Sequence, residues 1–132
     1  MALCAVLSSP VAQAVNNCNS KDFTDLTAES SVYLTFTQLA YSTRCSRVNP
    51  GTMITFSGDF SSHPLRGGQI IDGTEVPDFG SPIPSVSVGT TTASFLIAPA
   101  GVYGFYCAYH GLFGESGVFD VGGEIVFSDS FD

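Results

Sequence analysis

The apolar residues of this chain show no sustained period of 3.6, and that absence constrains its fold more than any other feature. Short runs rich in β-branched and aromatic residues occur instead, separated by Gly, Pro, Ser and Asp, as is typical of strands and turns. These runs cover residues 31–37, 52–56, 93–97, 102–107 and 118–121, with 124–127 as a candidate final strand. Many short strands with almost no helix predict an all-β fold, an antiparallel β-sandwich.

Two segments depart from this pattern. Residues 22–29 have a weak helical period, which predicts one or two helical turns. Residues 66–92 contain three prolines and five glycines, and we expect the longest irregular stretch there. Neither segment resembles a linker, and 132 residues suffice for one domain with one hydrophobic core.

The charge of the chain limits its partners. Four Lys and Arg residues stand against twelve Asp and Glu residues, so the formal net charge is −8. This balance argues against nucleic-acid binding, which needs cations facing phosphates. No apolar run outside the N-terminus is long enough to span a bilayer. We also expect no enzymatic activity, because the sequence offers neither a nucleophile–base pair nor a second metal centre.

The first fourteen residues resemble the end of a signal peptide. They are uncharged, largely apolar, and finish in Ala12-Gln13-Ala14, with small residues where signal peptidase requires them. The positively charged start of such a peptide is missing, so we interpret residues 1–14 as a truncated leader and residues 15–132 as the single mature domain. The expected location is the periplasm or the exterior of the cell.

Cleavage at that point leaves three cysteines. In an exported protein, an odd number suggests one disulfide and one thiol with a separate role. Cys18 and Cys45 are the expected pair, which leaves Cys107. The alternative is that all three are buried and reduced.

Cys107 lies three residues before His110, and His63 is the one other histidine. At the end of a strand, this spacing lets the chain fold back so that the thiolate and the imidazole converge. One thiolate and two imidazoles with a weak axial group form the donor set of a blue-copper centre. The sequence therefore predicts a site for one copper ion at His63, Cys107 and His110.

The residues around these ligands resemble the cupredoxins, the plastocyanin- and azurin-like copper proteins. Residues 105–118 are similar to their C-terminal copper loop, and residues 55–65 to the segment that supplies the first histidine. The resemblance covers roughly residues 30–122 and implies a Greek-key β-sandwich that carries single electrons. It also implies a redox partner protein, such as a cytochrome or a copper enzyme, and we expect the protein to be a monomer.

Two positions depart from the family pattern. Glu115 occupies the place of the axial methionine, and Met1 and Met53 both lie far from the loop. A carboxylate there would favour copper(II) and lower the reduction potential. Alternatively, Glu115 points to water and the Ser62 carbonyl is a distant axial group. Pro64 is the second departure, because it has no N–H to donate near the sulfur.

In the family, apolar residues surround the second histidine and form the docking surface. Here that surface would consist of Pro64, Leu65, Gly111, Leu112 and Phe113. Three other functions stay open: a copper-binding, delivery or resistance protein without electron transfer, a zinc site with the same donors, and a metal-free adhesion sandwich.

Overall fold

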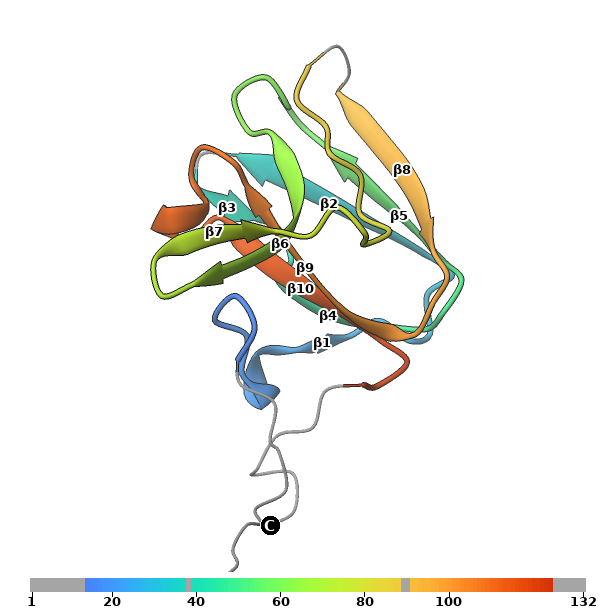
Figure 1. The fold of residues 1–132 in the computed structure, drawn as a ribbon. Helices are drawn as coiled ribbons and strands as arrows, with labels where there is room; N and C mark the ends of the chain where they lie inside the picture. Colours follow the sequence, from blue (N-terminus) through green and yellow to red (C-terminus); the bar gives the residue numbers. More distant parts are fainter. Residues whose placement is uncertain (1–13, 38, 89–90, 125–132) are drawn as a thin grey trace, which may run out of the picture.

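Two β-sheets face each other in the computed structural model, which describes residues 14–37, 39–88 and 91–124 (Figure 1). The larger sheet contains, in order, β1 (Thr24–Asp25), β4 (Cys45–Val48), β10 (Ser116–Val121), β9 (Gly101–Cys107), β6 (Leu65–Ile71) and β7 (Thr74–Pro77). The smaller sheet contains β3 (Ala40–Tyr41), β2 (Ser31–Thr37), β5 (Thr52–Ser57) and β8 (Thr92–Ile97). Two 3₁₀ helices, η2 (Ser20–Asp22) and η3 (Gly111–Phe113), complete the described elements.

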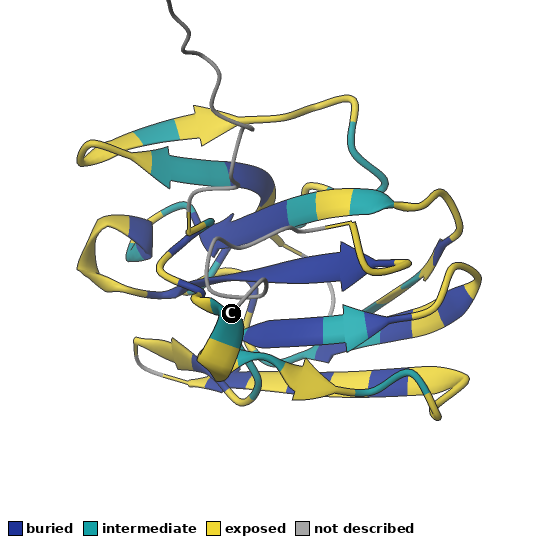
Figure 2. Cartoon of the chain, turned by 90° about the horizontal axis from the view of Figure 1, so that it is seen from below, coloured by how far each residue is buried: buried dark blue, intermediate teal, exposed yellow. Residues whose placement is uncertain are grey.

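The core lies between the sheets and follows from alternation along the strands. On β2, Val32, Leu34 and Phe36 are buried while the residues between them are exposed. β10 is buried along its whole length, and its neighbourhood forms the dark blue centre of Figure 2. Its Phe119 joins the main core, whereas Val118 faces outward and is covered by the Cys18–Cys45 disulfide.

The predicted sandwich is confirmed, and so are the five predicted strands, to within two residues at each end. The sheets are mixed and not purely antiparallel, because β4 pairs parallel with β10, and β2 pairs parallel with β5. The predicted helical turns over residues 22–29 are wrong. η2 ends at Asp22, and Thr24 and Asp25 pair with β4 instead, so tertiary pairing overrides a weak local period.

The expected irregular stretch at residues 66–92 is wrong over its first part, which forms the β6–β7 hairpin. Asp72 and Gly73 both have positive φ, at 51° and 73°, as a tight two-residue hairpin turn requires. Gly68 is the reason that the sequence did not predict strand β6, because glycine is typical of irregular segments. Its φ is 144°, and an added Cβ would lie 2.3 Å from the Val76 carbonyl oxygen, so the strand needs glycine there.

The N-terminal segment is tied to the larger sheet by a disulfide and by one side chain. Cys18 and Cys45 are bonded, as predicted, with 5.8 Å between their Cα atoms. The Asn16 amide nitrogen donates to the carbonyls of Gly68, Phe105 and Gly117, at 3.3, 3.2 and 2.7 Å. Its oxygen accepts from the Ile70 N–H at 2.8 Å. Asn16 therefore connects three strands.

Two sequence predictions fall beyond the described part of the chain. Of the leader assigned to residues 1–14, the structure describes only Ala14, and of the candidate strand at 124–127 it describes only residue 124. No helix among the described residues is long and apolar enough to cross a membrane.

Candidate metal centre

His63 is held by the loop that joins β5 to β6. The Asp59 carboxylate accepts hydrogen bonds from the Ser61 N–H at 3.0 Å and from the Ser62 hydroxyl at 2.9 Å. The Asp59 carbonyl accepts one from the His63 N–H at 2.9 Å. Phe60 is fully buried and anchors the loop in the core. These local contacts fix where the His63 ring enters the site.

Cys107, His110 and Glu115 come from the turn between β9 and β10. The Cys107 N–H donates to the Glu115 carbonyl at 3.0 Å, which closes the base of the turn. The Glu115 N–H donates to the His110 carbonyl at 3.2 Å. Gly114 has a φ of 103°, a left-handed conformation that glycine adopts without strain. The turn meets the His63 loop where the Ala108 N–H donates to the Pro64 carbonyl at 2.8 Å.

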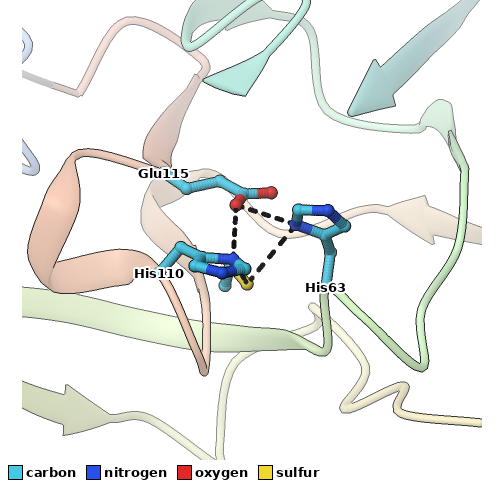
Figure 3. Close-up of side chains that lie close together, drawn as sticks. His63, His110 and Glu115 are labelled. Carbon is cyan, nitrogen blue, oxygen red and sulfur yellow. Dashed lines mark hydrogen bonds and ion pairs between the residues drawn. The ribbon is translucent and has the colours of Figure 1, made fainter. Parts of the chain in front are cut away.

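The four predicted donor atoms converge on one point (Figure 3). The Cys107 Sγ lies 3.9 Å from the Nδ1 of His63 and 3.5 Å from the Nδ1 of His110. The Glu115 Oε1 lies 2.9 Å and 3.2 Å from the same two nitrogens. Each of the four residues has a donor atom within 4.8 Å of those of the others.

These separations fit a single small metal ion. With metal–nitrogen bonds of about 2.0–2.1 Å and metal–sulfur bonds of about 2.3 Å, tetrahedral geometry places donor atoms about 3.3–3.6 Å apart. The measured separations lie on both sides of that range, so small side-chain movements suffice to surround an ion. A thiolate and two imidazoles suit copper, and the set with a carboxylate also suits zinc.

Glu115 is the member of the group whose position the sequence left open, and its side chain is fully buried. The alternative that it points to water is therefore wrong. Its second oxygen, Oε2, is buried and has no hydrogen-bond partner among the described residues. Burying a carboxylate with only one of its two oxygens partnered is costly, so its presence beside two histidines and a thiol fits a bound cation.

The Cys107 thiol is fully buried, and burial raises its pKa to about 11. The Tyr109 and His110 N–H groups act in the opposite direction by hydrogen bonding to the sulfur, and the Glu115 charge raises the pKa further. A metal ion must displace this proton to bind the thiolate. These two N–H groups also donate to the sulfur in place of the N–H that Pro64 lacks, and nothing in the sequence predicted them.

Only some of the residues expected to form a docking surface are exposed around His110, whose side chain is itself 31% exposed. Leu112 and Phe113 are 52% and 72% exposed, as a docking surface requires. Leu65 is only 1% exposed, because it begins β6 with its side chain in the main core. Pro64 and Gly111 are likewise buried. The prediction is therefore wrong for Leu65, Pro64 and Gly111 as exposed contact residues.

Sequence reasoning missed two aromatic residues at the site. The Tyr109 ring is 63% exposed and stands edge-on to His110, with ring centroids 6.4 Å apart. The Phe36 ring contacts His63 from the core side at 5.8 Å. The position of Tyr109 beside His110 was the available signal for the first. Phe36 is 27 positions from His63 and gave none.

No family model matches this sequence, and no curated protein matches it. Solved structures do. A pseudoazurin from Sinorhizobium meliloti matches with 19% identity and a TM-score of 0.53, over 70% of this chain and 73% of that protein. A pseudoazurin from Methylobacterium extorquens AM1 shows 26% identity and a TM-score of 0.49, over 72% and 77%.

A purple cupredoxin from Nitrosopumilus maritimus shows 21% identity and a TM-score of 0.48, over 69% of this chain and 99% of that one. Only the match to the Sinorhizobium pseudoazurin, among these three, has a TM-score above 0.5, and it shows that the two proteins share a fold. The chain thus has the fold of the cupredoxins, with a His, Cys, His and Glu group that could form a copper site.

Proposed function

We propose that this protein binds one copper ion through His63, Cys107 and His110 and carries single electrons. The convergence of the Cys107 Sγ and the two Nδ1 atoms is the observation that supports this function. Copper would supply a one-electron couple, since thiolate suits copper(I) and imidazole suits copper(II). The chain would supply rigidity, because backbone hydrogen bonds fix the turn and the His63 loop relative to each other.

Glu115 is the proposed fourth ligand. Its Oε1 already lies within 3.2 Å of both Nδ1 atoms, and its fully buried side chain excludes water from that side of the site. An anionic oxygen favours copper(II) over copper(I), so the reduction potential should be lower than with a thioether in this place. Met53 cannot serve instead, because it is 39% exposed on β5, with its side chain outside the core.

Electrons would pass through the exposed edge of His110, with Leu112, Phe113 and Tyr109 as the surrounding contact surface. A small apolar surface suits brief docking with a redox partner, such as a cytochrome or a copper enzyme. A periplasmic or secreted location is supported by the Cys18–Cys45 disulfide and by the leader-like residues before it. We propose that the protein acts as a monomer and is not an enzyme.

One alternative function is copper binding, delivery or resistance without electron transfer. The buried Glu115 carboxylate favours it, as does the lack of a methionine near the site among the described residues, because a site biased toward copper(II) binds copper(I) less well. Reversible voltammetry would favour electron transfer, whereas loss of copper on reduction would favour delivery. Zinc in the same site would be colourless and redox-silent.

The test is to add copper(II) to the purified domain and to record its visible and paramagnetic spectra. The Glu115→Gln and Glu115→Met variants are measured beside it. A strong thiolate-to-copper charge-transfer band in the unmodified protein is expected, with changed spectra in both variants. Loss of the band in Cys107→Ser identifies the thiolate. If no such band forms in the unmodified protein, the proposed function is refuted, and unchanged spectra in both Glu115 variants would remove Glu115 from the ligand set.

A further inference from the structure

The two oxygens of the Glu115 carboxylate have different surroundings. Oε1 faces the two imidazoles, at 2.9 and 3.2 Å (Figure 3). Oε2 is buried and has no hydrogen-bond partner among the described residues. A buried polar atom without a partner destabilises the fold, and more so when the atom carries charge. The structure must therefore offer a donor near Oε2, or the carboxylate is poorly held.

Tyr41 is the residue that can supply that donor. It ends β3, it is 4% exposed, and its hydroxyl is also buried without a partner in the described part of the chain. Its ring is held by Phe36, Phe56 and Phe105, with centroids 5.7, 5.8 and 4.9 Å away. The packing of these three rings therefore holds the Tyr41 ring in place.

The neighbourhood of Tyr41 is that of the metal centre. β3 lies against β10, the strand that begins immediately after Glu115. The Tyr41 pKa is raised well above its ordinary value, first by burial and then by the negative charges of Glu115 and Cys107. Phe36 contacts both Tyr41 and His63, so the same packing cluster supports both rings.

No direct hydrogen bond joins the Tyr41 hydroxyl to Glu115 in the structure. We propose that Tyr41 is a positioning residue for Glu115, and that one enclosed water molecule accepts a hydrogen bond from the Tyr41 hydroxyl and donates one to the Glu115 Oε2. This pairing satisfies two buried polar atoms at once and leaves Oε1 directed at the imidazoles. It deepens the proposed copper site, on which it rests for its effect on metal binding. The contact itself is a property of the metal-free protein and can be tested there.

Tyr106 provides a matched control. It is another tyrosine with a fully buried ring, and its hydroxyl interacts with the Arg66 side chain. The charged groups that act on it are Arg66 and Glu75, and not Glu115. Tyr41→Phe and Tyr106→Phe therefore remove the same atom from equally buried rings, and only the first removes the proposed donor.

The first experiment uses infrared spectroscopy on the metal-free protein. The difference between the unmodified protein and Glu115→Gln identifies the Glu115 carboxylate band. That band should shift in Tyr41→Phe and stay in place in Tyr106→Phe, because a hydrogen bond to one oxygen changes the carboxylate stretch. A band unmoved by Tyr41→Phe overturns the proposal. Circular dichroism confirms that each isosteric variant is folded.

The second experiment measures copper(II) affinity in a double-mutant cycle. Loss of a group that orients a ligand typically weakens metal binding about 10–100-fold, and this is the loss expected for Tyr41→Phe. On the Glu115→Gln background the same substitution should change the copper(II) dissociation constant less than about twofold, since the carboxylate through which Tyr41 acts is absent. An equal loss on both backgrounds would show that Tyr41 does not act through Glu115.

The two experiments also separate this proposal from the proposed function. If the unmodified protein binds no copper, the proposed function fails, while the infrared result still decides whether Tyr41 contacts Glu115. If copper binds as expected and the band does not move, the copper site stands and the role of Tyr41 is rejected.

Discussion

Removing the Cys18–Cys45 disulfide should destabilise the fold strongly and leave the proposed metal site unchanged. The bond closes a loop with a sequence separation of 27 residues. On the chain-entropy model, ΔS is about −2.1 − 1.5R ln 27, or about −12 cal/mol/K, which corresponds to about 3.5 kcal/mol at 25 °C. The described domain of about 110 residues has an unfolding entropy near 230 cal/mol/K, so the melting temperature should fall by about 15 °C.

The change is the Cys18→Ala, Cys45→Ala double variant, and the assay is denaturant unfolding of the metal-free protein. Reduced unmodified protein is the control, because it opens the cross-link without removing the buried sulfur atoms that cover Val118. Both should lose stability, with the variant losing somewhat more. Copper(II) spectra of the variant should match those of the unmodified protein. A loss below about 1 kcal/mol in both forms would refute the reasoning that this bond restrains the unfolded chain.

Three further perturbations test other parts of the structure. Asn16→Ala should lower the free energy of unfolding by about 2–4 kcal/mol, since it leaves carbonyls of three strands and the Ile70 N–H without their partner. Asn17→Ala, at an exposed neighbour, is a matched control because both residues have a positive φ; it should lower the free energy of unfolding by only about 1 kcal/mol, the strain of alanine in that conformation, and equal effects would contradict the role of Asn16. The Cys107 thiol should titrate with a pKa of about 11 in the metal-free protein. Its pKa in the folded protein lies above that in the unfolded chain, so its contribution to stability is complete below about pH 9 and is lost as the pH rises toward 11. The free energy of unfolding measured across that pH range should fall, and it should fall less in Cys107→Ser. Identical pH profiles for the two proteins would contradict the raised pKa. Gly68→Ala should disrupt the β6–β7 hairpin, because the added Cβ would lie 2.3 Å from the Val76 carbonyl oxygen. In Gly73→Ala the added Cβ meets open space, and the variant bears only the strain of its positive φ. Gly68→Ala should therefore have the lower melting temperature by circular dichroism, and the opposite order would refute this argument.

Local patterns in the sequence were sufficient for the strands that carry the core. The alternation on β2 predicted its bounds because a strand buried on one face must repeat every two residues. The spacing of Cys107 and His110 also predicted convergence, since the turn after β9 is closed by contacts within nine residues. His63 was predicted as the second imidazole of the site because it is the one other histidine in the chain.

The sequence by itself thus predicted the all-β class, the order of the proposed ligands and the pairing of Cys18 with Cys45. Tertiary structure alone decided which way side chains face at the site. Glu115 is buried beside the imidazoles, whereas Leu65, expected at the surface, lies in the core. The β6–β7 hairpin and the role of Asn16 were also decided there. The physical reason is that burial and polar pairing depend on strands distant in the chain, which no local pattern records.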